Sequence, residues 1–317
     1  MNNPYLRDIK ISKTEIGNIE LRNKRLIPAN TIMLYKEKTR DLDTFMGTDS
    51  YIMCDRPLRF PGIIEGDKQV CWMTVEPSEI ASFQDFIDSA KGNVCLCGCG
   101  LGYVAYMLSL KEDVESITIV ELNSDIIEMF KTQILPQFKN KDKINIVQSD
   151  AIEYLQTADL SSYDYVNVDI WRDTLDMLPL YLPCLVVEAA YPDVNFSYWL
   201  EPTLKDLFRK SLLEQFSGYQ NSRSTCFEYA NVIAKDILDN TDIKTKQDLK
   251  DLIKLDDMRD ILRMWYLSHP QLSDEYQRAS AKKMQEMMSF LNQVSGNEPA
   301  KTPGAKMLNK LIGDKKL

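Results

Sequence analysis

Histidine is almost absent from this 317-residue chain, which has His269 alone, and no G-x-S-x-G segment occurs. Hydrolysis by a catalytic triad uses a histidine beside an activated nucleophile, so this chemistry is not expected here. Long hydrophobic runs are missing as well. The longest uncharged apolar stretch, Leu178–Val187, has about ten residues and contains two prolines. A helix that spans a bilayer needs about 20 apolar residues, so we expect no membrane segment.

Basic residues are in the minority: 38 Lys and Arg stand against 47 Asp and Glu, which gives a formal net charge of −9. Nucleic-acid binding needs clustered basic residues, so we expect no nucleic-acid partner and a neutral or cationic small-molecule substrate instead. The first 26 residues are rich in charge and lack the apolar core of a secretory signal. Together with an odd number of cysteines, seven, this favours reduced thiols and a cytoplasmic protein, either a monomer or a homo-oligomer.

The most informative stretch is residues 94–102, Val-Cys-Leu-Cys-Gly-Cys-Gly-Leu-Gly. An apolar run ends there in glycines, and an amphipathic segment leads to a second apolar run, Ile117–Val120, closed by Glu121. This order predicts a strand, a glycine turn, a helix and a second strand that ends in an acid. Glycines let a turn approach a ligand closely, and a carboxylate accepts bonds from two ribose hydroxyls, so we expect a nucleoside-bearing ligand.

The glycine spacing separates two kinds of nucleoside ligand. Gly98, Gly100 and Gly102 form G-x-G-x-G, whereas a dinucleotide-binding turn needs its third glycine at position 103, which is Tyr103. The turn resembles motif I of class I S-adenosylmethionine-dependent methyltransferases and of the related spermidine synthases. A NAD-dependent oxidoreductase is therefore the least favoured interpretation.

Further acids extend this resemblance. Glu121, 19 residues after Gly102, matches the family's ribose-binding acid, although a solvated carboxylate at a strand end is the simpler alternative. Asp150 follows the predicted third strand, where the family bonds the adenine amino group; capping the next helix is its alternative role. Asp169 ends the predicted fourth strand. The resemblance gives it the catalytic position, where it would hold the methionyl amine of the cofactor S-adenosylmethionine or accept a proton.

The segment after the fourth strand departs from the spermidine synthases. They carry an Asp-Ser-x-Asp-Pro-like segment, whereas this chain has Asp169-Ile-Trp-Arg172-Asp173 and no following proline. Because Arg172 replaces the second acid, we expect an S-adenosylmethionine-dependent methyltransferase acting on a small-molecule methyl acceptor. The alternatives are a spermidine synthase-like aminopropyltransferase that uses the decarboxylated cofactor, and a non-catalytic cofactor-binding scaffold.

Aromatic side chains and one glutamate are candidate substrate contacts. Trp72, Trp171 and Trp199 lie near predicted element ends, and aromatic faces can enclose a cationic sulfonium or amine. Glu79, near the start of a predicted helix, could reach an amine, although the helix dipole alone favours an acid there. Ordinary packing is the simpler explanation for the tryptophans. The alternate cysteines of residues 95–99 lack the spacing of a zinc site, so we expect buried thiols and no metal.

Strands and helices alternate over residues 91–200, which predicts a Rossmann-like, doubly wound α/β domain with a parallel sheet of order 3-2-1-4-5. The predicted strands are 94–98, 117–121, 144–148, 164–169 and 194–200, with Leu185–Val187 as a competitor for the last. The predicted helices are 102–111, 124–138, 151–157 and 174–190. No pair of strands suited to positions six and seven follows, so we expect the sheet to stop at five.

Three regions flank this predicted cofactor-binding domain. Residues 1–90 are expected to hold short strands and a lead-in helix, at Thr31–Tyr35, Tyr51–Cys54, Gln69–Val75 and Glu76–Ala90. Residues 201–295 are expected to be helical, with an N-terminal cap at Thr245 and a long helix over 272–294. One helix there carries an apolar stripe, made of Met258, Ile261, Leu262 and Trp265. Residues 296–317 form a basic tail that we expect to be flexible, with a docking helix over Met307–Ile312 as the alternative.

Overall fold

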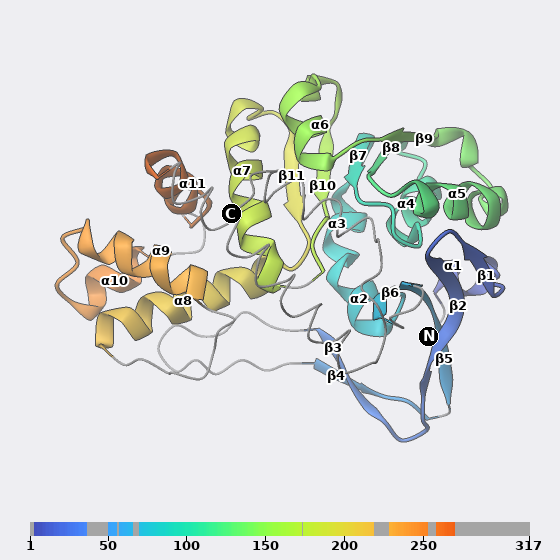
Figure 1. Cartoon of the computed structure of the whole chain (residues 1–317), viewed down its shortest axis with the longest axis horizontal. Coiled ribbons are helices and arrows are strands. Elements are labelled where there is room, and N and C mark those ends of the chain that lie inside the picture. The colour runs from blue at the N-terminus through green and yellow to red at the C-terminus, as the bar shows by residue number, and fades with distance from the viewer. Residues whose placement is uncertain are drawn as a thin grey trace, which may run out of the picture.

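The computed structural model describes residues 3–36, 50–55, 57–65, 70–172, 174–218, 228–252 and 258–269. A parallel sheet of five strands forms the centre of the molecule (Figure 1). In spatial order its strands are β9 (Ile144–Gln148), β8 (Val114–Glu121), β7 (Gly92–Cys97), β10 (Tyr165–Val168) and β11 (Asn195–Tyr198). This is the predicted order 3-2-1-4-5, and it confirms the Rossmann-like fold. None of the helices in the described ranges is long and apolar enough to cross a membrane.

The alternation of side chains along β7 produces two hydrophobic cores, one on each face of the sheet. Val94 and Leu96 belong to one core, and Cys95 and Cys97 belong to the other. The first core is covered by α4 (Tyr103–Ser109) and α5 (Ser124–Met129), and the second by α6 (Ala151–Thr157) and α7 (Thr174–Ala190). Because both faces are covered, the central strands β7 and β8 are mostly buried along their length.

Several predicted elements need correction. The run Leu185–Val187 is wrong as a strand, because it lies inside α7. The predicted helix 124–138 is α5 followed by a π turn and a 3-10 turn, at Phe130–Ile134 and Leu135–Gln137. The single helix expected before β7 is broken at Phe83 into α2 (Pro77–Ser82) and α3 (Gln84–Ser89).

The N-terminal region contains more sheet than the sequence indicated. An antiparallel sheet joins β1 (Thr14–Ile16), β2 (Ile19–Ile27), β5 (Leu58–Glu65) and β6 (Val70–Thr74), and a hairpin joins β3 (Ile32–Lys36) and β4 (Ser50–Met53). β2 was not predicted because its many charged residues hide the apolar alternation of a strand, although Ile19 and Leu21 are buried. β5 contains Pro61 and Gly62, residues that are typical of turns and rare inside strands, so its sequence does not indicate a strand. A short helix, α1 (Pro4–Asp8), precedes the sheet.

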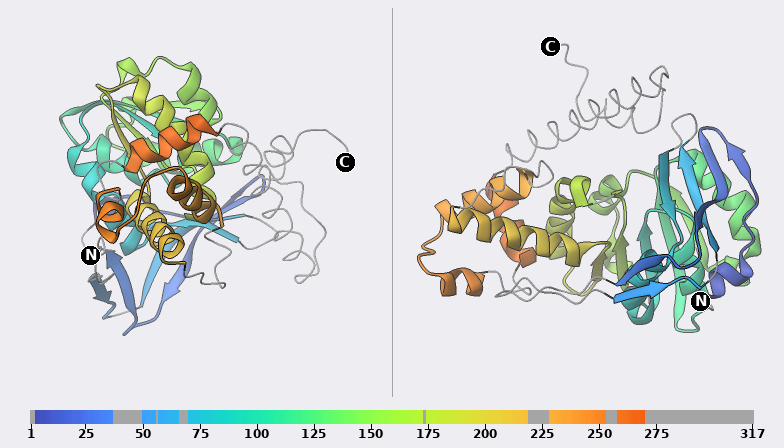
Figure 2. Two further views of the ribbon diagram at one scale, coloured as in Figure 1. Left: turned by 90° about the vertical axis from the view of Figure 1, so that its left-hand side faces the viewer. Right: turned by 90° about the horizontal axis from the view of Figure 1, so that it is seen from below.

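Helices follow the last strand, and they lie at the end of the molecule away from β1 and β2 (Figure 2). They are α8 (Glu201–Ser217), α9 (Glu228–Asp239), α10 (Lys246–Leu252) and α11 (Met258–Ser268). Met258, Leu262 and Trp265 are buried, as the stripe predicted, and Thr245 caps α10 through its hydroxyl to the Asp248 N–H. No strand follows β11 in the described residues. The predicted helix 272–294 and the tail 296–317 lie outside them.

An arginine joins α11 to the central domain. Arg259 donates hydrogen bonds to Glu188 of α7, at 2.6 Å, and to both carboxylate oxygens of Glu201 of α8, at 2.7 Å. Its guanidinium also lies 5.1 Å from the centre of the Tyr198 ring at the end of β11. Both carboxylates are largely buried, and Arg259 contacts both of them, while Lys205 pairs with Glu201 alone at 3.2 Å.

We predict that Arg259→Met lowers the free energy of unfolding by at least about 2 kcal/mol, because Glu188 and Glu201 lose their hydrogen bonds to the guanidinium and only Glu201 keeps an ion pair, with Lys205. The matched control is Arg263→Met on the same helix, whose partner Asp260 is largely exposed. This control is expected to cost less than about 1 kcal/mol. Urea unfolding curves measure both values, and equal losses in the two variants would contradict the prediction.

Candidate functional site

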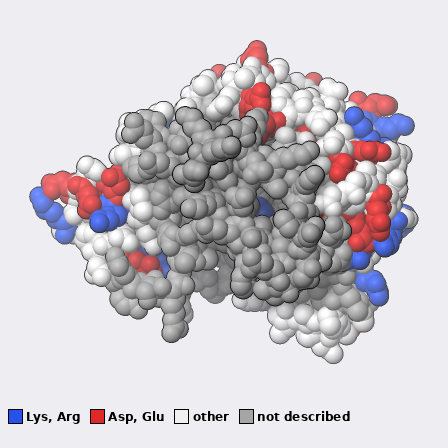
Figure 3. Space-filling model, viewed as in Figure 1, with Lys and Arg blue, Asp and Glu red and all other residues white. Residues whose placement is uncertain are grey.

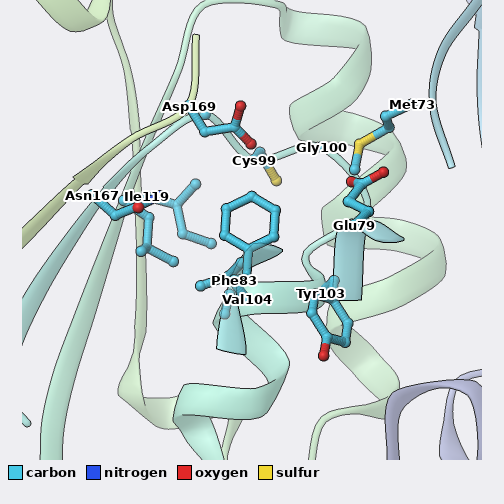
Figure 4. A pocket seen from close by; sticks show the side chains of 13 residues that line it. Met73, Glu79, Phe83, Cys99, Gly100, Tyr103, Val104, Ile119, Asn167 and Asp169 are labelled. Carbon is cyan, nitrogen blue, oxygen red and sulfur yellow. The ribbon is translucent and has the colours of Figure 1, made fainter. Parts of the chain in front are cut away.

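A cavity opens at the carboxyl ends of β7 and β10, where the strand order reverses. Ligands of doubly wound folds bind at this switch point. Its wall includes Met73, Glu79, Phe83, Gly98, Gly100 and Asp169 (Figure 4). The cavity is narrow, with a free volume of about 30 Å³. A nucleoside therefore fits only if side chains of the wall move.

The glycine turn after β7 is closely packed by other parts of the protein. Gly98, Gly100 and Gly102 all have positive φ, at 103°, 49° and 68°. A Cβ on Gly100 would lie 2.3 Å from Met73 Sδ, and the Leu101 N–H donates to the same sulfur at 3.1 Å. The space beside the turn at Gly100 is therefore occupied by a side chain of the protein. The Met73 thioether stands beside Gly100, and Gly102 faces Phe130 rather than the cavity.

Three partly buried carboxylates, Asp169, Glu79 and Glu121, surround the turn. Burial raises the pKa of Asp169 to about 7, and the neighbouring Glu121 adds to this effect. Burial likewise raises the pKa of Glu79 well above its usual value, with further contributions from Asp169 and Glu76. In Figure 4 the side chains of Asp169 and Glu79 lie on opposite sides of the space beside Phe83. Of the Lys, Arg and His side chains that the structure describes, none forms an ion pair with Asp169, Glu79 or Glu121.

Glu121, the predicted ribose-binding acid, holds the glycine turn in this structure. Its Oε2 accepts the N–H of Cys99 at 2.9 Å, and its Oε1 accepts the N–H of Asn123 at 2.8 Å. Burial raises the pKa of Glu121, and these backbone donors counteract the rise by stabilising the ionised form. The carboxylate is therefore fixed beside the turn, and its role toward ribose stays a prediction.

Asp150 takes the alternative role that the sequence offered. Its Oδ1 accepts the N–H groups of Ile152 and Glu153, at 2.9 and 3.2 Å, and so caps α6. It follows β9 at the same edge of the sheet as Glu121, and its charge acts on the thiol of Cys97 at the end of β7. Because Asp150 caps α6 in this structure, its contact with adenine stays a prediction.

Two of the three candidate tryptophans lie beside the cavity wall. The Trp199 ring is stacked on Phe83 with ring centres 6.0 Å apart, and its indole N–H donates to Ser82 at 2.9 Å. The buried Trp171 donates to the Trp199 carbonyl at 2.9 Å. These rings support Phe83 rather than line the cavity. Trp72 lies away from it on β6, and its indole N–H donates to Glu65 at 3.0 Å.

Met73 and Phe83 are among the wall residues that the sequence did not single out as site candidates. Phe83 was visible only as one apolar position of the lead-in helix, and Met73 as a strand residue. The available signal was the spacing of Phe83 four residues after Glu79, which places both on one side of a helical segment.

The alternate cysteines point inward. Cys95, Cys97 and Cys99 are free and buried, and burial raises the pKa of the Cys99 thiol. In the described ranges no three His, Cys, Asp or Glu side chains are grouped so that they could hold a metal ion.

Comparisons with known proteins bear on the same part of the chain. Residues 73–180 match the spermine/spermidine synthase domain family. This confirms the predicted resemblance to the superfamily of class I methyltransferases and spermidine synthases. Among solved structures, the spermidine synthase of Thermotoga maritima is 15% identical, with a TM-score of 0.31, over 59% of this chain and 72% of that one. A spermidine synthase bound to the transition-state analogue AdoDATO is 14% identical, with a TM-score of 0.32, over 62% and 72%. Curated protein sequences give no match.

The expectation of a methyltransferase is wrong, because the family that matches is that of the spermine and spermidine synthases. The matched residues include Asp169 and Arg172, so the altered segment after β10 lies within the match. The sequence of that segment, with Arg172 in place of the second acid, is therefore compatible with the family match. The match supports the alternative, an aminopropyltransferase-like protein.

We predict that Asp169→Asn makes the ligand-free protein more stable than the wild type at pH 8 but not at pH 4. The raised pKa of Asp169 means that its stabilising contribution is complete below about pH 4. This contribution is lost as pH rises through about 7. The difference between variant and wild type should grow by up to about 4 kcal/mol over this range. Chemical denaturation at both pH values measures it, with the exposed Asp113→Asn as control. An unchanged difference would contradict the burial argument.

Proposed function

We propose that this protein transfers an aminopropyl group from decarboxylated S-adenosylmethionine to a small amine. The observation that carries the proposal is the group of desolvated carboxylates Asp169, Glu79 and Glu121, without an ion-pair partner among the described residues. A buried charge is costly unless a partner of opposite sign balances it. A cationic ligand would supply that partner. The match of residues 73–180 to the spermine/spermidine synthase domain supports the same proposal.

The charge of the ligand distinguishes the decarboxylated donor from intact S-adenosylmethionine. The decarboxylated donor carries a sulfonium and an ammonium group and no carboxylate. The intact molecule adds a carboxylate, which would meet Asp169 and Glu79 as a like charge in a desolvated cavity. We therefore propose that these two residues favour the decarboxylated form.

The transfer itself needs alignment and one proton acceptor. The acceptor nitrogen attacks the aminopropyl carbon next to sulfur, the carbon–sulfur bond breaks, and 5′-methylthioadenosine leaves with the bonding electrons on sulfur. The new secondary ammonium then loses a proton. Asp169, which lines the cavity and has a pKa of about 7, is suited to accept it. Glu79, on the other side, is placed to hold an acceptor amine, and Glu121 and Asp150 are proposed for ribose and adenine.

Ligand entry requires a rearrangement at Met73. Its thioether occupies the space beside Gly100, and the free cavity is too small for a nucleoside. Methionine is unbranched and flexible, so a change of the Met73 rotamer would open the site at a small cost in free energy. The Leu101 N–H would then be released from sulfur and could bind a ligand acceptor.

The surface and the remaining sequence departure bear on two further points. In the described parts of the face in Figure 3, acidic and basic side chains are interspersed, which suits a small-molecule acceptor.

One second candidate function is a protein that binds the donor without turnover. Two observations favour it: Arg172 stands where the spermidine synthases carry a second acid, and the glycine turn is closely packed.

The experiment is to incubate the purified chain with decarboxylated or intact S-adenosylmethionine and a panel of diamines and polyamines. Mass spectrometry then identifies the products. We expect 5′-methylthioadenosine and an aminopropylated amine with the decarboxylated donor only. Asp169→Asn should reduce turnover by about 100-fold or more, and Asp113→Asn should not change it.

Other outcomes have definite meanings. Binding of the decarboxylated donor without product across the whole panel would favour the non-catalytic candidate. A lack of binding, or equal affinity for the intact donor, would contradict the proposed role of the carboxylates.

A further inference from the structure

We propose that Tyr5 is a positioning residue that fixes the glycine turn of the site from the far N-terminal end of the chain. Its hydroxyl donates to the Leu101 carbonyl at 2.6 Å, across 96 positions of sequence. The N–H of the same peptide unit, that of Gly102, donates to Cys99 at 2.8 Å. Both polar groups of this peptide are therefore held, one by the turn itself and one by α1. The inference rests on the proposed function, because it concerns the binding of the same ligand.

The need for such a contact follows from the glycines. Gly100 and Gly102 flank Leu101 and have positive φ, and glycine allows a peptide unit to rotate at little steric cost. A rotation about this peptide would change where the turn presents its N–H groups. The hydrogen bond from Tyr5 opposes that rotation, because it binds the carbonyl that would have to move.

The surroundings of Tyr5 make it a rigid donor. The side chain is fully buried, and its ring packs edge-on against Tyr103 and Tyr106, with ring centres 5.6 and 5.7 Å away. Burial raises the pKa of Tyr5 far above its usual range, and the neighbouring Cys99 and Glu79 contribute. The hydroxyl therefore remains protonated at physiological pH and donates its hydrogen bond throughout.

The turn also connects Tyr5 to the carboxylate that the proposed function assigns to ribose. Glu121 accepts the N–H of Cys99, and the Cys99 carbonyl accepts the N–H of Gly102. A shift of the Leu101–Gly102 peptide would thus reach Glu121 through two hydrogen bonds. Tyr5 lies outside the cavity wall, so it acts on the ligand through the turn and not by contact.

The chain supplies a matched control in Tyr106. Its hydroxyl donates to Asp8 at 2.7 Å, so it also joins α1 to α4 and belongs to the same group of rings. Its hydrogen bond does not involve the glycine turn. Tyr5→Phe and Tyr106→Phe each remove one hydroxyl from the same contact between helices, and both keep the ring.

The test measures binding of 5′-methylthioadenosine by calorimetry and, without ligand, the hydrogen exchange of the Gly102 amide by NMR. We expect Tyr5→Phe to weaken binding about three- to tenfold and to speed exchange at Gly102 by a similar factor. Tyr106→Phe should change both by less than about twofold. Thermal unfolding should shift to a similar extent in the two variants.

Equal effects on binding in both variants, or no effect in either, would overturn the inference, because a merely structural contact does not distinguish them. If the wild type binds no 5′-methylthioadenosine, the proposed function fails. Faster Gly102 exchange in Tyr5→Phe alone would then still show that Tyr5 fixes the turn, and unchanged exchange would reject that as well.

Discussion

The site depends on the cost of keeping negative charge out of water. Asp169, Glu79 and Glu121 are desolvated together beside one turn, and burial raises the pKa of each. The three carboxylates lie close together because the ends of the strands and α2 meet at the point where the sheet order reverses. A protein that gained nothing from the charges would be more stable with neutral residues there. The arrangement is therefore best understood as a complement to a cation that arrives from outside.

The adenosine and amine parts of the proposed ligand would contact different regions of the chain. Gly98, Gly100 and Glu121 lie on the β7–β8 unit, which any adenosyl ligand would use. The group that distinguishes a methyl from an aminopropyl donor is the charged tail, which we propose lies between Asp169 and Glu79 of α2. This explains why the motif alone did not separate the two transferases. The family match begins at residue 73, before the motif, and so includes α2.

The central sheet was predictable because its signals are local. Strand and helix alternate at regular spacing, so the strand order follows, and β9, α6 and α7 have the predicted bounds. β2 and β5 were not predictable in the same way, because their stability comes from pairing with each other across about 40 positions. The site residues also divide into those with a local sequence signal and those placed by tertiary packing. The strand-end acids could be found from sequence, whereas Met73 beside Gly100 and Phe83 beneath Trp199 result from tertiary packing.

The most direct test of this account is the number of protons released when the donor binds. Calorimetry of decarboxylated S-adenosylmethionine at pH 6.5, in two buffers of different ionisation enthalpy, gives this number. Asp169 is mostly protonated at that pH because its pKa is about 7, and a bound cation should drive it to ionise. We predict net proton release in the wild type and a smaller release in Asp169→Asn. Tight binding without proton release, or with proton uptake, would contradict the claim that these carboxylates pair with a cation.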